Sequence, residues 1–286
     1  VPLAPLHNPA SLIGIREARI LLPDIPHVAV FDTAFHQTMP PKAYLYALPY
    51  RYYQDHRIRR YGFHGTSYRY VSRRTARLLG KPLLDKLKMV ICHFGNGVSM
   101  AAVDGGKSID TSMGLTPLEG LIMGTRSGDI DPGVIFFLHR QLGMSIDRIE
   151  EMLNKESGLL GISETSNDMR DIIQKAGEGD ERCRLALEAF AYRARKYVGA
   201  YAAALGGLDA VVFTAGIGEN SPLVRQMICE NLEFMGVILD ESTNKKAAGM
   251  ETIISAPESK VSVLVIPTDE ERVIVEDTLA VAGLAD

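Results

Sequence analysis

The segment from residue 88 to residue 112 constrains the fold of this chain more than any other. It contains three short runs, the largely apolar MVICHF and VSMAAVD and then KSIDTS, which are separated by Gly95-Asn96-Gly97 and by Asp104-Gly105-Gly106. Short runs of this kind predict strands, and the Gly-rich steps between them predict tight hairpin turns. The segment is therefore predicted to form three antiparallel strands in a meander.

Alternating helices and strands are predicted after the meander. From about Glu181 to Leu205 apolar residues recur at spacings of three and four, which predicts a long amphipathic helix that ends at Gly206-Gly207. The runs LDAVVFTA and VSVLVIPTDEE each indicate a buried strand, then a loop, then a helix. A three-stranded meander followed by such alternation is the ribonuclease-H-like order, so the predicted fold class is α/β.

The first 86 residues are predicted to belong to another unit. Asn8-Pro9 is typical of a helix start, and the apolar run HVAVFDTAF, residues 27–35, predicts a buried strand with Asp32 at its carboxyl end. A further helix is predicted from about Thr66 to Leu79, which places His64 just before a helix amino terminus. Free N–H groups and the helix dipole suit that position to binding an anion.

Charge and cysteine content narrow the function classes. The chain has 286 residues with 31 basic and 35 acidic side chains, interspersed so that no electrostatic footprint for nucleic acid results. The short basic run from Arg51 to Arg60 is interpreted as a solvated edge. Cys92, Cys183 and Cys229 lack the spacing of a disulfide framework or a zinc site, which favours a reducing cytoplasm. No run approaches the roughly 18 apolar residues that span a bilayer, so no membrane partner is predicted.

Two glycine-rich turns are candidate phosphate-binding sites. Gly95-Asn96-Gly97 follows His93, and outward N–H groups beside an imidazole could hold a phosphate oxygen, although an ordinary hairpin turn is the alternative. GIGEN, residues 216–220, follows an apolar strand and opens a helix, as nucleotide-binding loops do. It lacks the full G-x-G-x-x-G pattern, and the antiparallel meander argues against a dinucleotide fold. A purely structural turn is the alternative here too.

Single charged residues near glycines or strand ends are the other candidates. MGTRSGDIDPG, residues 123–133, surrounds Arg126 with glycines, which suggests close backbone approach to a ligand and a bidentate clamp on phosphate or carboxylate. The alternative is a surface loop held by salt bridges. His64 could equally be structural, Asp32 could cap the next helix, and Glu270 could simply favour a helix dipole.

Eight segments together resemble the acetate kinase family, which belongs to the superfamily of sugar kinases, heat-shock ATPases and actin. They run in family order along nearly the whole chain: PLHNP, VFDTAFHQTMP, RRYGFHGTS, HFGNG, MGLTPLEGLIMGTRSGDIDP, SNDMRDI, TAGIGEN and VIPTDEE. Each segment alone has little specificity. Eight in register identify the chain as a member of that family.

The resemblance implies a reversible phosphoryl transfer from ATP to acetate that gives acetyl phosphate and ADP, with Mg²⁺ or Mn²⁺, in a homodimer. It implies catalytic roles for Asp32, His64 and Arg126, and a metal-associated role for Glu270. Leu6, Phe63 and Pro117 correspond to the apolar pocket for the acetate methyl group. The positions that correspond to ATP contacts are His93, Phe94, Gly95, Asn96, Gly97, Asp168, Met169, Arg170, Gly216, Ile217, Gly218, Glu219 and Asn220.

The sequence also departs from the family pattern. Tyr68 stands where many members have a second His, and the family's Asn-x-Gly-Ser-Ser phosphate loop and a later Arg do not occur in these residues. The resemblance then implies an actin-like, ribonuclease-H-like duplicated fold whose amino-terminal domain is incomplete. Residues 1–86 are its remainder, 87–270 form the nucleotide-binding domain, and 271–286 form a terminal helix that returns to the first domain.

Several functions are compatible with these observations. Propionate or butyrate could replace acetate, since one methylene in an apolar pocket separates substrates by only about 1–3 kcal/mol. The missing loop favours a non-catalytic nucleotide-binding fragment. An ATPase or chaperone-like relative would have no use for MGTRSGDIDP and GFHGTS.

Overall fold

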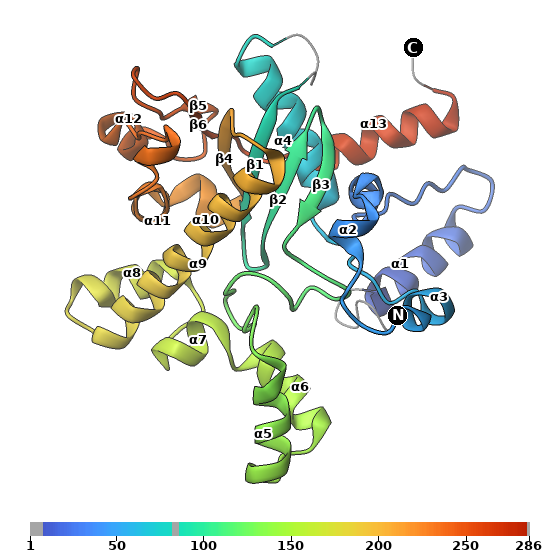
Figure 1. Cartoon of the computed structure of the whole chain (residues 1–286). Coiled ribbons are helices and arrows are strands. Elements are labelled where there is room, and N and C mark those ends of the chain that lie inside the picture. The colour runs from blue at the N-terminus through green and yellow to red at the C-terminus, as the bar shows by residue number, and fades with distance from the viewer. Residues whose placement is uncertain (1–7, 82–85, 285–286) are drawn as a thin grey trace.

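The computed structural model describes residues 8–81 and 86–284, which are built around a single six-stranded sheet (Figure 1). The strand order is β3-β2-β1-β4-β6-β5. The predicted α/β fold class is confirmed. The strands are β1 (Lys88–Phe94), β2 (Val98–Asp104), β3 (Lys107–Thr111), β4 (Ala210–Thr214), β5 (Thr252–Ile253) and β6 (Ser262–Val265).

The helices fall into three groups along the chain: before β1, between β3 and β4, and after β4. Those before β1 are α1 (Asn8–Leu21), the 3-10 helix η1 (Ala34–Thr38), α2 (Pro41–Tyr44), α3 (Arg51–His56) and α4 (Gly65–Leu78). Between β3 and β4 lie α5 (Pro132–Leu142), α6 (Ile146–Lys155), α7 (Gly158–Ser163), α8 (Met169–Gly177) and α9 (Glu181–Leu205). The remainder are α10 (Ala215–Asn220), α11 (Pro222–Cys229), η2 (Glu233–Met235), α12 (Glu241–Lys246) and α13 (Glu270–Ala282).

The meander forms as predicted. β1 pairs antiparallel with β2 from Lys88–Asp104 to Phe94–Val98, so the three residues 95–97 make the hairpin turn. β2 pairs antiparallel with β3, and β4 lies parallel to β1 on its other side. The predicted strands after the meander correspond to β4 and β6, which are parallel to each other. The carboxyl ends of β1, β4 and β6 therefore meet at one edge, where open α/β sheets bind ligands.

Each face of the sheet is covered by a long helix (Figure 1). Val90, Cys92 and Phe94 of β1 point to the face that α9 covers, whereas Met89 and Ile91 point to the face that α4 covers. The predicted helix from Glu181 to Leu205 is confirmed as α9, with Asp180 as its amino-terminal cap and Gly206 in the left-handed conformation at its end. α4 thus packs directly on the sheet.

Two local predictions are wrong. Residues 27–31 have no regular structure, residues 32–33 form a turn and Ala34–Thr38 form η1, so the predicted strand over 27–35 is absent. A strand needs a neighbour for its N–H and C=O groups, and none of the strands in the described residues pairs with this segment. GIGEN is not a loop before a helix either, because Gly216–Asn220 lie inside α10.

The last helix lies against α4. Arg69 of α4 and Asp277 of α13 form an ion pair of 2.6 Å, and Arg73 approaches Glu276 to 3.5 Å. α13 begins at Glu270, one residue before the predicted terminal unit. The division into 1–86, 87–270 and 271–286 stays a prediction. In the part of the chain that the structure describes, no helix is both long and apolar enough to cross a bilayer.

Candidate active site

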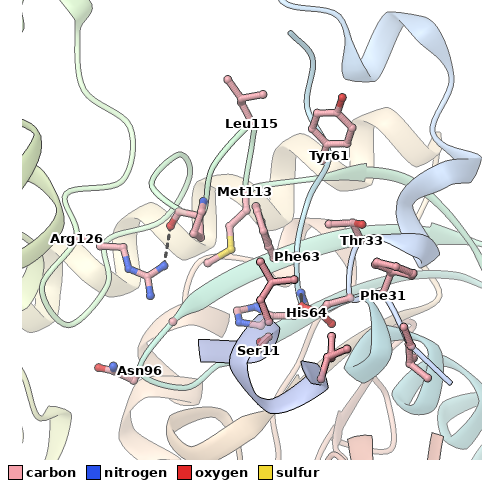
Figure 2. Close-up of a pocket in the computed structure, with 17 residues that line it drawn as sticks. Ser11, Phe31, Thr33, Tyr61, Phe63, His64, Asn96, Met113, Leu115 and Arg126 are labelled. Atoms are coloured by element: carbon pink, nitrogen blue, oxygen red, sulfur yellow. Dashed lines mark hydrogen bonds between the residues drawn. The ribbon is translucent and has the colours of Figure 1, made fainter. Parts of the chain in front are cut away.

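A cavity of about 970 Å³ opens beside the turn between β1 and β2 (Figure 2). It brings together segments that are far apart in the sequence. Three catalytic residues predicted from the sequence, Asp32, His64 and Arg126, line it, as do Asn96 and Gly97 of the turn. The cavity is therefore the candidate active site.

Asp32 and His64 are joined through the start of α4. The His64 N–H donates to Asp32 Oδ2 at 2.5 Å, and the Thr66 N–H donates to Oδ1 at 3.2 Å. The Gly65 N–H donates to the Asp32 carbonyl at 2.8 Å, so closely that a Cβ on Gly65 would lie 2.1 Å from that oxygen. Asp32 thus binds N–H groups at the helix amino terminus, the alternative that the sequence left open, and still lines the cavity.

The backbone of His64 is held in an unusual conformation. Its φ of 56° is in the left-handed region, which costs a non-glycine residue on the order of 1–3 kcal/mol. The bond to Asp32 and the start of α4 hold this conformation. Strain of this kind is concentrated at functional sites.

Arg126 enters the cavity from a loop that the rest of the protein fixes. Its Nη1 donates to the Pro117 carbonyl at 2.7 Å, shown as a dashed line in Figure 2. Among the described residues no carboxylate pairs with Arg126, although the side chain is only 9% exposed. Burial lowers the pKa of Arg126, but a guanidinium stays charged in proteins. A buried cation without a counter-ion suits an anionic ligand.

Asp129, Asp131 and Gly128 of this loop make contacts within the protein itself. Asp129 accepts from the Gly120 N–H at 2.8 Å and from the Tyr197 hydroxyl at 2.6 Å. Asp131 caps α5. A Cβ on Gly128, whose φ is +67°, would lie 2.3 Å from the Leu121 carbonyl. Gly128 therefore allows close packing against the chain itself rather than approach to a ligand.

The turn at residues 95–97 lies close to His64, to Arg126 and to the start of α10. A Cβ placed on Gly97 would lie 3.3 Å from His64 Nε2 and 3.5 Å from Arg126 Nη2, so both groups border the same space. One placed on Gly95 would lie 3.7 Å from Ala215 Cβ, at the start of α10. The Gly95 N–H donates to the Gly97 carbonyl at 3.1 Å and so is directed within the turn. The predicted anion nest has at most the later N–H groups of this turn.

The cavity walls near Arg126 are apolar. Phe63 and Pro117, both predicted for the substrate pocket, line the cavity together with Met113 and Leu115, which were not predicted individually although they lie in the segment MGLTPLEGLIMGTRSGDIDP. Figure 2 shows Phe63 and Met113 between His64 and Leu115. Leu6, the third predicted pocket residue, lies outside the described residues.

The predicted nucleotide residues around α8 are divided between core and surface. Asp168 caps α8 and pairs with Arg170 at 2.5 Å, and this bond holds the pKa of Asp168 at about 2. Met169 packs in the core, as does Phe94, whose ring contacts Phe190 and Phe213. The side chains of Phe94 and Met169 are therefore part of the core, and their predicted contact with ATP stays a prediction.

The residues of α10 differ in how far they are exposed to solvent. Gly216 and Asn220 are exposed, Gly218 is buried and Ile217 packs partly on the core. Glu219 Oε1 accepts the Ala215 N–H at 2.7 Å and the Thr268 N–H at 3.1 Å. Glu219 therefore ties the start of α10 to the segment before α13, and the exposed side at Gly216 is left for a ligand.

Comparison with known proteins identifies the chain. Residues 1–276 match the sequence model of the acetokinase family. The chain belongs to the acetokinase family. It is 60% identical over 279 residues to the acetate kinase of Thermotoga maritima, covering 97% of this chain and 69% of that protein.

Solved structures give the same result. The crystal structure of Porphyromonas gingivalis acetate kinase superposes with a TM-score of 0.94 at 53% identity, covering 98% of this chain and 70% of that one. A propionate kinase from Francisella tularensis gives a TM-score of 0.90 at 48% identity, with 96% and 69% covered. The actin-like fold predicted from the resemblance is that of these acetokinase relatives.

Several polar residues that support the acetokinase site were not found from the sequence. Ser99 bonds to His64, Ser67 bonds to His93, and Thr268 bonds to Ser67. Arg225, fully buried, donates to the carbonyls of Gly218 and Glu219 and holds the end of α10. Ser67 lies inside GFHGTS and Thr268 inside VIPTDEE, so the motifs were a usable signal for these two.

Proposed function

We propose that this chain carries out the acetate kinase reaction, the reversible transfer of the γ-phosphoryl group of ATP to acetate. The observation that carries the proposal is the pair His64 Nε2 and Arg126 Nη2, which border one space above Gly97 at the end of an apolar-walled cavity. An oxygen of acetate bonds to the γ-phosphorus, the bond from that phosphorus to the β–γ bridging oxygen breaks, and ADP leaves.

The chemistry needs positioning and charge neutralisation rather than a strong base. Acetate is already ionised at neutral pH, since carboxyl pKa values are near 4. The transferring group spreads negative charge over its equatorial oxygens. Arg126 supplies a fixed positive charge there and His64 supplies a donor. Phe63 and Pro117 exclude water from the acetate methyl group.

The described residues fit a divalent ion, for which we propose Mg²⁺, with Mn²⁺ as the substitute. Burial and the nearby carboxylates of Asp32 and Glu271 raise the pKa of Glu270, so a cation bound among these groups would be favourable. In the part of the chain described, no cluster of three or more His, Cys, Asp or Glu side chains forms a metal site. Mg²⁺ commonly uses one or two carboxylates plus substrate phosphates. Glu270 would hold it, Asp32 would balance its charge and waters, and the ion would neutralise the phosphates.

The proposal is tested by assaying the intact polypeptide with ATP, Mg²⁺ and acetate, trapping the acyl phosphate as a hydroxamate. Propionate and butyrate are run in parallel, because the apolar pocket could accept a further methylene. A kcat/KM highest with acetate supports the assignment. Higher kcat/KM with propionate would make the protein a propionate kinase, and ATP binding without acyl phosphate would favour the non-catalytic alternative.

A paired glycine substitution tests the nucleotide surface. Nothing lies within 4 Å of a Cβ on Gly216, whereas a Cβ on Gly218 would lie 3.4 Å from the Phe213 carbonyl carbon and 3.5 Å from the Cys92 carbonyl oxygen. Gly216→Val is expected to weaken ATP binding about tenfold or more, about 1.4 kcal/mol. Gly218→Val is expected instead to destabilise the fold by about 1–3 kcal/mol through overpacking. Calorimetric titration and thermal unfolding separate the two effects.

Gly216→Ala is the matched control, with a smaller loss of ATP affinity because one methyl intrudes less. An unchanged ATP affinity in a folded Gly216→Val variant would remove the exposed side of α10 from the nucleotide site.

A homodimer in the cytoplasm is also proposed. Phe136 and Phe137 of α5 are more than half exposed, at 56% and 57%, which is unusual for adjacent aromatic side chains and typical of an interaction surface. The three cysteines are buried and unpaired, which fits a reducing compartment.

A further inference from the structure

The imidazole rings of His64 and His93 stack on each other, and each ring is held by a serine hydroxyl that bonds to its Nδ1. Their centroids are 4.0 Å apart and the ring planes differ by 19°. His64 Nδ1 lies 2.7 Å from Ser99 Oγ, and His93 Nδ1 lies 2.9 Å from Ser67 Oγ. Each serine also bonds to a second hydroxyl: Tyr68 lies 2.5 Å from Ser99, and Thr268 lies 2.8 Å from Ser67.

In the first series of hydrogen bonds, from Tyr68 through Ser99 to His64, the direction of donation follows from the burial of Tyr68. The Tyr68 side chain is fully buried, and Ser99 Oγ is the acceptor that lies within reach of its hydroxyl. Burial raises the pKa of Tyr68 well above its usual value, so the phenol keeps its proton. An unbonded buried O–H would cost about 1–3 kcal/mol. Tyr68 therefore donates to Ser99, and the Ser99 proton is donated to His64 Nδ1.

In the second series of hydrogen bonds, from Thr268 through Ser67 to His93, donation also runs toward the histidine. The Thr268 hydroxyl donates to Ser67 Oγ, which leaves the Ser67 proton for His93 Nδ1. Burial, and then the neighbouring His64, lower the pKa of His93 well below its usual value, which keeps this ring neutral. A neutral imidazole whose Nδ1 accepts a hydrogen bond carries its proton on Nε2.

We propose that Tyr68–Ser99 and Thr268–Ser67 are positioning relays that fix His64 and His93 as Nε2–H tautomers, so that both rings present a donor beside the turn at residues 95–97. The geometry of that turn supports this: a Cβ on Gly97 would lie 3.3 Å from His64 Nε2, and one on Gly95 would lie 3.9 Å from His93 Nε2. This inference deepens the proposed function, on which its kinetic part rests. The Nε2–H of His64 then donates a hydrogen bond to the transferring phosphoryl group, beside the positive charge of Arg126.

A third histidine provides an internal reference. His36 Nε2 lies 2.9 Å from the Phe63 carbonyl, which can only accept, so His36 is an Nε2–H tautomer with Nδ1 accepting from Ser108 at 2.8 Å. It has the same Ser–Nδ1 bond, a carbonyl fixes its tautomer, and it is not among the residues that line the cavity. Ser108→Ala is therefore the matched control for Ser99→Ala.

The test combines ¹⁵N NMR of the histidine rings with steady-state kinetics on the intact polypeptide. The native protein is expected to show Nε2–H signals for His36, His64 and His93. Ser99→Ala is expected to populate the Nδ1–H form of His64 and to lower kcat about 10- to 100-fold, the scale for removing a group that orients a functional histidine, with little change in the KM for ATP. Tyr68→Phe is expected to produce a smaller loss of the same kind, and Ser99→Thr to restore both readouts.

The Ser108→Ala control is expected to lose similar stability but to keep kcat and the His36 tautomer. His64 found as Nδ1–H in the native protein, or a folded Ser99→Ala variant with unchanged tautomer and kcat, would overturn the relay. If Ser99→Ala changes the tautomer in a protein without acetate kinase activity, the relay is supported and the proposed function fails.

Discussion

Replacing Arg126 with alanine is expected to lower kcat about 100- to 1000-fold while the affinity for ATP changes little. That range is the usual loss when one preorganised charge-stabilising donor is removed, about 2.7–4 kcal/mol of transition-state stabilisation. The positions around α8 and α10 that correspond to ATP contacts in the family do not include Arg126. Steady-state kinetics and ATP titration on the same preparation measure both quantities.

The structure separates this effect from misfolding. The Arg126 side chain donates a hydrogen bond to the Pro117 carbonyl, and the loop is also held by the Met123 N–H bond to the Arg126 carbonyl, by the Ser127 N–H bond to Leu153 and by Asp129. Arg126→Ala should therefore fold with a small loss of stability. Arg148→Ala, which removes an exposed ion pair with Glu156 on α6, is the matched arginine control and should leave kcat unchanged. An Arg126→Ala variant that keeps most of its kcat would contradict the proposed role.

Elements with strong local patterns were predicted well from the sequence. The meander has apolar runs and Gly-rich turns of the correct length, and α9 has both periodicity and a terminal glycine pair. The apolar run over 27–35 has as strong a local pattern, yet it forms no strand. Strand formation depends on a neighbouring strand, and that information is not local.

The site was predicted only to the level of motifs. Three catalytic candidates from distant segments do line one cavity, because the motifs flank elements that converge on the end of β1. The glycines around Arg126 differ from one another: Gly128 is required by the Leu121 carbonyl, whereas a Cβ on Gly124 would lie 3.0 Å from Oδ1 of Asn96, which lines the cavity. The relay through Ser99 and Tyr68 joins β2 to α4. Such a hydrogen bond between distant elements leaves no periodic signal in the sequence.

The second large effect is expected at Asp32, where a helix-capping role and a catalytic role overlap. Asp32 accepts the N–H groups of His64 and Thr66, and its charge also raises the pKa of Glu270. Asp32→Asn keeps one acceptor oxygen for the His64 N–H and loses the longer bond to the Thr66 N–H, because an amide NH2 cannot accept. Asn still caps helices about as well as Asp. The fold should therefore survive, while the charge that balances the proposed metal and its waters is lost.

Asp32→Asn is accordingly expected to lower kcat about 100-fold or more, on the scale of removing one preorganised electrostatic group. The unfolding free energy should fall by about 1 kcal/mol, the scale of one lost hydrogen bond, and Asp32→Ala should lose about 1 kcal/mol more because it removes the remaining acceptor. A readout independent of turnover is available, because removing the Asp32 charge should shift the pKa of Glu270 downward, while burial still holds it above its ordinary value. NMR titration of Glu270 measures this shift.

Asp131→Asn at the cap of α5, where the Gly133 N–H is bound at 2.9 Å, is the matched control and should keep kcat. If Asp32→Asn turns over normally and only Asp32→Ala is impaired, Asp32 is a helix cap and its charge has no part in the transfer.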